Sequence, residues 1–331
     1  MPALHRKSAA AVLLVPLLAA LALWAFAWPA TRTAPRDLPL GVAGAPAAAA
    51  PVERRLAARD GAFEVHRYAD EAAARAAIED RKVYGAVVAT PDGPKLLTAS
   101  AASPVVAQLL QQALTAQAPA GTKVTTVDVV PAPAADPRGA ALSSSILPLV
   151  IAGVAAGAAV TLMRLRGVRA VCTLLGIAAV VGIVGAALAD SWLGALTGDW
   201  WTEAGVLGLT SLAISGSVAG LAALLGPAGI GLGAVTMVLL GNAFSGVASA
   251  PQLLPEPVGA IGQLLPPGAG GSLLRSVAYF DGAAATTPVI TLAAWAGPGL
   301  TAVLLGSLRG RRAAGTAGRT AAPAPVPEPV G

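Results

Sequence analysis

Apolar residues dominate the second half of the chain, where residues 142–308 carry very little charge. The charged side chains of this stretch are Arg164, Arg166, Arg169, Asp190, Asp199, Glu203, Glu256, Arg275 and Asp281. They separate apolar runs of roughly twenty residues, the length that crosses about 30 Å of hydrocarbon. The pattern predicts a membrane domain, because a soluble domain of this size needs far more charged surface.

Six membrane spans follow from this pattern. One covers residues 9–28 and ends in Trp24 and Trp28, aromatic residues typical of a membrane–water interface. The other five cover residues 145–163, 170–189, 204–225, 228–244 and 288–305. We expect the first span to be an uncleaved anchor; a signal peptide cleaved after Ala25-Phe26-Ala27 is the alternative interpretation.

Between the first two spans, residues 29–141 have the composition of a soluble domain. Turn residues separate short runs in which apolar positions alternate or cluster, which predicts the order β-α-β-α-β-β-α-β. The strands are expected at residues 38–43, 63–68, 84–89, 95–99 and 123–130, and the helices at 52–59, 70–80 and 104–116. The fold class is therefore an α-helical integral membrane protein of six transmembrane helices, with an α/β domain inserted between helices one and two.

The composition fits this fold and excludes several functions. Charged residues make up 12% of the chain, against about 25% in a typical soluble domain. The net charge of +5 does not indicate nucleic-acid binding, because the basic residues lie where membrane topology places them. Cys172 is the only cysteine and the two histidines, His5 and His66, are far apart, so we expect neither disulfides, a metal site nor another cofactor.

Charge also predicts the orientation. If residues 1–8 are cytoplasmic, six spans place the loop at 164–169 and the tail at 309–331 in the cytoplasm as well. Nine Lys and Arg residues then face the cytoplasm, and Arg275 alone lies in the short outer loops, as the positive-inside rule requires. We expect a multi-pass plasma-membrane protein with both termini cytoplasmic, an extracytoplasmic α/β domain and a disordered, Pro/Ala-rich basic tail.

Motifs for catalysis and ATP binding are absent from the sequence. There is no H-E-x-x-H, no G-x-S-x-G and no histidine in the membrane stretch, so no catalytic residue is expected. There is no G-x-x-x-x-G-K-[ST] either, so another chain would have to supply any ATPase. The predicted span interiors hold no charged residue, which argues against a transporter driven by ion coupling.

Two features of the membrane stretch stand out. Gly153 with Gly157, and Gly216 with Gly220, place small residues one helical turn apart, which permits close helix crossing within the bundle or at a dimer face. The outer segment, residues 245–287, is rich in proline and glycine and then turns apolar and aromatic. It predicts a short amphipathic helix at the outer interface with Arg275 on its polar side; an ordinary interfacial loop is the alternative.

Three stretches of the chain resemble a known family. They are Leu38-Pro-Leu-Gly-Val-Ala43, the segment from Ala73 to Val88 with Tyr84-Gly85-Ala86-Val87-Val88 at its end, and the Pro-rich segment from Leu265-Pro266-Pro267-Gly268 to Tyr279. Together with the layout of the spans, they are similar to the type-2 ABC exporter permeases and the related phage-infection-protein-like membrane proteins.

The resemblance implies a homo- or heterodimeric permease that works with a cytoplasmic ATPase subunit and exports lipids, polymers or drugs. Pro266, Pro267, Gly268, Arg275 and Tyr279 are the candidates for an outer gate or interfacial segment, with Arg275 and Tyr279 expected to shape the gate. The family usually offers the ATPase a cytoplasmic coupling helix. Here the N-terminal segment is short, and the loop with Arg164, Arg166 and Arg169 is the remaining candidate for docking.

Two functions are therefore expected from the sequence. The first is a permease-like membrane subunit of an export system, embedded in membrane lipid. The second is a non-transporting envelope protein, either a scaffold, a secretion-associated protein or a receptor, that binds partners through its extracytoplasmic domain.

Overall fold

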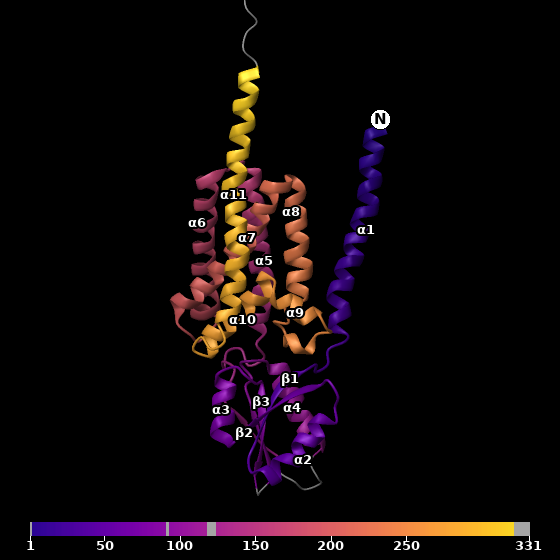
Figure 1. The fold of residues 1–331 in the computed structure, drawn as a ribbon, viewed down its shortest axis with the longest axis vertical. Helices are drawn as coiled ribbons and strands as arrows, with labels where there is room; N and C mark the ends of the chain where they lie inside the picture. Colours follow the sequence, from indigo (N-terminus) through magenta and orange to yellow (C-terminus); the bar gives the residue numbers. More distant parts are fainter. Residues whose placement is uncertain (1, 91–92, 118–123, 321–331) are drawn as a thin grey trace, which may run out of the picture.

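The computed structural model, which describes the backbone of residues 2–90, 93–117 and 124–320, consists of a bundle of long helices with an α/β domain at one end (Figure 1). Helix α1 (Pro2–Ala30) stands beside the bundle and leads into the domain. The chain re-enters the bundle through α5 (Ala140–Leu162). Long helices thus cover the apolar stretches. In the sequence, the strands of the sheet lie between α1 and α5.

The α/β domain has the predicted order of elements. Its strands are β1 (Leu38–Ala43), β2 (Phe63–Tyr68), β3 (Gly85–Thr90), β4 (Gly93–Thr98) and β5 (Thr125–Asp128), and its helices are α2 (Pro46–Ala57), α3 (Glu71–Glu79) and α4 (Pro104–Gln117). They form a mixed sheet in the order β2-β1-β3-β4-β5, in which only the β3–β4 pair is antiparallel.

Helix α3 shows how the local sequence sets the ends of an element. Asp70 caps its start, since the Asp70 carboxylate accepts a hydrogen bond of 2.8 Å from the backbone N–H of Ala73. At its end, the N–H groups of Arg81 and Lys82 donate to the carbonyls of Ile78 and Ala77. This is a Schellman motif in which Arg81, with φ of 58°, takes the left-handed position that glycine usually fills.

The two faces of the sheet carry separate apolar cores, and both extend into the outer segment. On the face covered by α3, Ile78 and Leu97 pack with Phe280. On the face covered by α2 and α4, Leu96 packs with Leu253. The domain therefore shares its cores with the membrane part of the chain, which fixes it to that end of the bundle.

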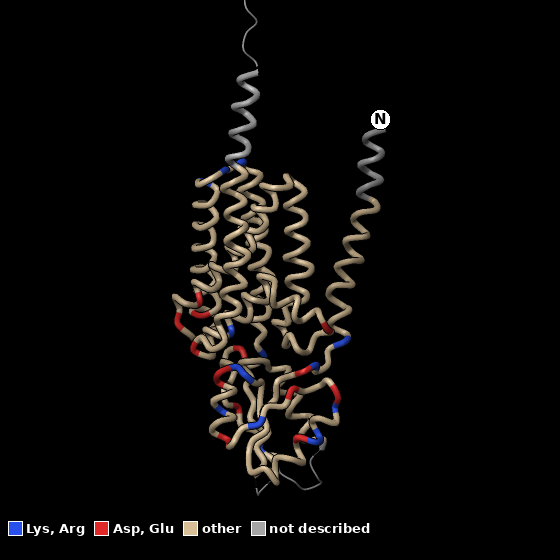
Figure 2. The backbone as a smooth tube through the Cα atoms, in the orientation of Figure 1, with Lys and Arg blue, Asp and Glu red and all other residues tan. Residues whose placement is uncertain are grey.

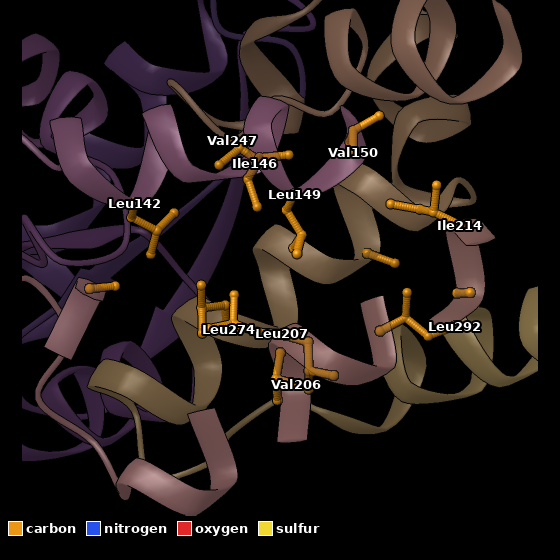
Figure 3. Close-up of a cluster of buried hydrophobic side chains, with 14 of the residues drawn as sticks. Leu142, Ile146, Leu149, Val150, Val206, Leu207, Ile214, Val247, Leu274 and Leu292 are labelled. Atoms are coloured by element: carbon orange, nitrogen blue, oxygen red, sulfur yellow. The ribbon is translucent and has the colours of Figure 1, made fainter. Parts of the chain in front are cut away.

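The bundle is built around α7. Its elements are α5, α6 (Gly167–Ala186), the π-helix η1 (Ala187–Trp192), α7 (Trp200–Leu225), α8 (Pro227–Ala234), the π-helix η2 (Val235–Asn242) and α11 (Thr286–Thr320). Among the long apolar helices, α7 is the most deeply buried. Figure 3 shows Ile146 of α5 and Ile214 of α7 in the cluster that joins these helices to Leu274 and Leu292.

Five helices are long and apolar enough to cross a membrane: Val12–Ala30, Ala140–Leu162, Gly167–Trp192, Trp200–Leu225 and Thr286–Gly306. They identify a helical, membrane-embedded protein. The stretch predicted as a span at residues 228–244 is shorter than these five helices. It consists of α8 and η2, which have eight residues each and together cover Pro227–Asn242. It nevertheless returns to the end of the bundle that carries the domain, where Phe244 packs with Ala25 of α1.

Figure 2 shows an uneven distribution of charge along the bundle. Asp and Glu residues gather in the α/β domain and in the adjoining loops. The opposite end of the bundle carries, among the side chains that the structure describes, the basic residues of the α5–α6 loop. Figure 1 places the start of α1 and the far end of α11 at that same end.

The predicted disordered tail is wrong in its first part, because α11 continues to Thr320. Residues 309–320 contain no proline to end the helix, and their alanines and arginines favour it, which outweighs the lower helix propensity of Gly310, Gly315 and Gly318. The rest of that prediction, residues 321–331, lies outside the described residues.

The outer segment contains the short helix predicted for it, but Arg275 does not lie on an exposed polar side. It contains a 3-10 turn η3 (Pro251–Leu253), α9 (Val258–Gln263) and α10 (Pro266–Tyr279). Helix α10 begins with proline in its first turn and packs against α7, α5 and α11. Arg275 is only 6% exposed. It does not lie on a polar outer face, because the α/β domain and residues 245–250 cover this end of the bundle.

Candidate functional site

A polar cavity of about 350 Å³ lies where the α/β domain meets the outer segment. Residues of β1 and the α3–β3 connection line it on the domain side, and residues of η3, α9, α10 and the start of α11 line it on the membrane side. Its polar lining residues are Arg81, Lys82, Tyr84, Gln252, Gln263, Ser272, Arg275 and Thr287. We call it the junction cavity.

Arg275 is the most buried charged residue of the junction cavity. Its Nη2 donates a hydrogen bond of 2.9 Å to the carbonyl of Val247, whereas its buried Nε–H has no partner. No ion pair of the described residues includes Arg275. A buried guanidinium without a carboxylate is costly, since burial removes the hydration of a full positive charge.

Arg81 reaches the cavity from the domain. Its Nη1 donates to the carbonyl of Ser272 at 2.9 Å and to the hydroxyl of Ser276, and its guanidinium lies 5.2 Å from the centre of the Phe280 ring. A non-glycine residue in the left-handed region costs of order 1 kcal/mol. Arg81 adopts this unfavourable backbone conformation at the point where its side chain joins the domain to α10.

Neutral polar side chains complete the lining. Tyr84 donates its hydroxyl proton to Gln252 Oε1 at 2.9 Å, which links the domain to η3. Ser272 donates to Gln263 Oε1 at 2.6 Å, and the Gln263 amide donates to the carbonyl of Ser245 at 2.7 Å. These contacts hold the cavity wall together from four different segments of the chain.

The electrostatics of the cavity follow from burial and like charge. Burial lowers the pKa of Arg81 to about 10, and the positive charge of Arg275 acts in the same direction. Burial likewise lowers the pKa of Arg275 and raises the pKa of Tyr84. Arginine stays protonated in folded proteins. The junction cavity therefore holds two positive charges, that of Arg275 buried and that of Arg81 half-buried.

The candidate gate residues do not form one site. Arg275 lines the cavity, but Pro266, Pro267 and Gly268 pack inside the protein at the start of α10. A Cβ added at Gly268 would lie 2.2 Å from the carbonyl oxygen of Gly262, so this turn tolerates no side chain. Tyr279 points elsewhere, with its hydroxyl donating to the carbonyl of Ala195 at 2.6 Å, and burial raises its pKa to about 12.

The four candidate packing glycines lie at helix contacts within the chain. Gly153 and Gly157 of α5 face α7, where added Cβ atoms would lie 2.8 Å from Ile214 and 2.7 Å from the Ser215 carbonyl oxygen. Gly216 and Gly220 of α7 face α11. These surfaces are occupied by the protein's own helices.

The candidate docking loop lies at the opposite end of the bundle. Arg164, Arg166 and Arg169 are exposed, and none has an ion pair among the described residues. Arg164 and Arg166 line a cavity of about 250 Å³ with the ends of α5, α7 and the apolar part of α11. The loop therefore offers unpaired positive charge beside a recess.

Sequence reasoning missed most of the junction cavity. Arg81, Tyr84 and Gln252 were predicted only as parts of a helix end, a strand and an outer loop. One signal was available for Arg81: it follows the last turn of a predicted helix, where glycine is the usual residue. No sequence signal pairs it with Arg275, because the two are far apart in the chain and meet only in the tertiary structure.

We compared the chain with known proteins. No family model, curated protein or solved structure matches it.

The chemistry of the site must therefore be judged from its geometry. In the described part of the chain, no group of His, Cys, Asp and Glu side chains could hold a metal ion. The junction cavity has instead two guanidinium groups, hydroxyls and amides, which are donors suited to an anion.

Proposed function

We propose that this protein is the permease-like membrane subunit of an export system and that it works with a separate ATPase subunit. In this proposal it crosses the plasma membrane six times, with both termini in the cytoplasm and the α/β domain outside. The substrate is an amphiphile with an apolar body and an anionic group.

The observation that carries the proposal is the position of α10 between two cavities. Leu274 lines an apolar cavity of about 540 Å³ between α5, α6 and α7, whereas its neighbour Arg275 lines the polar junction cavity. One helix thus separates a compartment suited to hydrocarbon from one suited to a charged group. A path for an amphiphile through the outer end of a membrane bundle needs both environments side by side.

The distribution of charge supports the orientation. The loop with Arg164, Arg166 and Arg169 lies at the end of the bundle opposite the α/β domain, as the positive-inside rule expects of a cytoplasmic loop. The path of α8 and η2 back to the domain end supports a sixth crossing, although this stretch is short.

The need for a partner ATPase rests on the absence of an energy source in the chain. The sequence has no phosphate-binding loop for ATP. Among the described residues, Glu203 is the carboxyl that is fully buried in the bundle, and it lies in the first turn of α7 rather than at membrane depth. The arginine loop and its recess would receive the partner.

Affinity purification of the tagged protein from native membranes in mild detergent tests this proposal. We expect a stoichiometric ATPase subunit with the wild type and its loss from a variant with Arg164, Arg166 and Arg169 all changed to alanine. A variant with Arg54 and Arg55 of α2 changed to alanine is the matched control, because it removes exposed positive charge from the domain instead. Absence of any ATPase from the wild-type preparation would reject the proposal.

A second function is favoured by the α/β domain itself. An apolar cavity of about 340 Å³ lies between α2, α4 and the sheet, lined by Leu40, Val52, Leu56 and Leu110 and bordered by Arg55 and Arg59. It suits a non-transporting receptor or scaffold that binds a partner or ligand outside the membrane. In the same purification, envelope proteins that disappear when Leu56→Asp places a charge in this apolar cavity, without an ATPase, would support this alternative.

A further inference from the structure

We propose that the junction cavity is a binding site for a phosphoryl group, held by Arg81 and Arg275. The site does not depend on export, because a scaffold with the same cavity would bind the same group. The argument rests on unbalanced charge, free donors and the position of the cavity along the bundle.

The cavity lacks a negative charge of its own. The ionisable side chains that act on Arg81 are Tyr84 and Arg275, and those that act on Arg275 are Tyr84 and Tyr279. Lys82 at the mouth is already paired with Asp80 at 2.8 Å, outside the cavity lining. Two cations, of which Arg275 is buried and Arg81 half-buried, therefore repel each other with no carboxylate in the cavity lining, and a bound anion would relieve that repulsion.

The cavity also has donor capacity that the protein does not use. The Nε–H of Arg275 is buried and unpartnered. Arg81 uses Nη1 for its contacts with α10, and its Nε–H and Nη2 make no hydrogen bond with the described residues. Guanidinium groups match the geometry of phosphate oxygens, and a planar fork binds two of them at once.

A purely structural role explains these residues less well. Hydrophobic residues of similar size would join the domain to α10 without the cost of burying charge. Glycine at position 81 would remove the backbone strain. The chain instead keeps two arginines at the contact, one of them in the left-handed region and the other with an unpaired donor.

The position of the cavity favours a phosphate at the membrane surface. Thr287 and Pro288 line it, and they open the apolar helix Thr286–Gly306. Lys82, Ala284 and Thr287 are exposed at its edge, so the cavity is accessible from outside the protein. A phosphodiester headgroup and a free phosphate share the chemistry that the arginines recognise, and the experiment separates these two sources.

Binding can be measured with the full-length protein in detergent. Titrations with inorganic phosphate, with glycerol phosphate and with phosphatidylglycerol in mixed micelles are followed by thermal unfolding, and native mass spectrometry identifies the bound species. A ligand that binds the folded state raises the unfolding midpoint. We expect saturable stabilisation by at least one of these three phosphate compounds. Micelles of the same detergent without any phosphate compound should give no stabilisation.

The variants decide whether the arginines hold the ligand. Arg275→Gln should weaken binding by at least roughly tenfold, since it removes a charge-assisted hydrogen bond. Arg275→Lys keeps the charge and guards against a folding defect, and it should bind more weakly than the wild type but better than Arg275→Gln. Arg54→Gln, an exposed arginine of α2, should bind like the wild type.

Each result has a defined meaning. Binding of phosphatidylglycerol alone assigns the site to a lipid headgroup, whereas binding of all three compounds assigns it to the phosphoryl group itself. No binding by the folded wild type, or equal binding by the folded Arg275→Lys and Arg54→Gln variants, would overturn the proposal. Neither outcome bears on the ATPase partner, which the purification tests separately.

Discussion

Two glycines on one face of α7 differ sharply in the room around them. A Cβ added at Gly220 would lie 2.7 Å from the Gly299 carbonyl oxygen and 2.9 Å from its Cα. At Gly216, one turn earlier, the nearest atoms would be 3.6 Å away, on Leu300. The two glycines of this pattern therefore differ: the α11 backbone contacts Gly220 directly, whereas a methyl group fits at Gly216.

We predict opposite effects of alanine at these two positions. Gly220→Ala should destabilise the protein by about 1–3 kcal/mol, because backbone atoms of α11 must move to admit the methyl group. Gly216→Ala should be neutral or stabilise by up to about 1 kcal/mol, since alanine favours the helix. Thermal unfolding of both purified variants in one detergent checks this. A Gly216→Ala variant as unstable as Gly220→Ala would contradict the α7–α11 packing.

At the scale of elements, the first turn of α3 carries a half-buried ionic cluster. The Glu71 carboxylate accepts hydrogen bonds from Lys95 Nζ at 2.7 Å and from Arg75 Nε at 2.9 Å. These two partners, Lys95 first, lower the pKa of Glu71 below its ordinary value of 4.5. The cluster ties α3 to β4, because Lys95 belongs to that strand.

This shift predicts a dependence of stability on pH. Because the pKa of Glu71 is lowered in the folded state, its ionised form stabilises the protein above pH 4.5, and that contribution is lost as the pH falls through the folded-state value. Glu71→Gln should therefore destabilise by about 1 kcal/mol at pH 7 and by less at more acid pH. Unfolding midpoints at pH 7 and pH 4 measure the difference.

Glu79 provides the control on the same helix. It is exposed and has no ion pair among the described residues. Glu79→Gln should therefore leave the midpoint nearly unchanged at both pH values. If Glu71→Gln and Glu79→Gln behave alike, the Lys95 contact contributes nothing measurable.

The elements differ in how well the sequence predicts them, and the reason is physical. Strands β1 and β2 coincide with the predicted ones, because their alternation and flanking turn residues are local signals. Helix α10 was predicted as a short helix but too exposed, since its burial depends on a domain encoded some two hundred residues earlier. The position of Arg81 and Arg275 in one cavity was unpredictable for the same reason, because no local sequence pattern indicates which distant segments meet.

At the scale of the whole molecule, the open question of architecture is whether α8 and η2 cross the membrane. Together they extend at most about 24 Å, the length that sixteen residues reach at the α-helical rise of 1.5 Å, which is less than the hydrocarbon core of about 30 Å. Yet η2 ends beside α1 at the domain end, whereas α8 begins at the far end next to Leu225. A short span of this kind is accommodated by local thinning of the bilayer.

We therefore predict that residues 225 and 256 lie on opposite sides of the membrane. Leu225→Cys and Glu256→Cys, each made in a Cys172→Ser background, place single exposed thiols on either side of α8 and η2. In right-side-out vesicles, an impermeant maleimide should label Glu256→Cys and leave Leu225→Cys unlabelled, and in inverted vesicles the order should reverse. Ala58→Cys, in the α/β domain, should follow Glu256→Cys in both preparations.

The pattern of labelling also decides between five and six crossings. If Leu225→Cys and Glu256→Cys react from the same side, α8 and η2 form a re-entrant hairpin and the C-terminal end of α11 lies opposite the start of α1. That arrangement would separate the basic tail from the arginine loop by a membrane and remove the charge bias that sets the orientation. Labelling on opposite sides places both at one face, where a single ATPase subunit could contact them together.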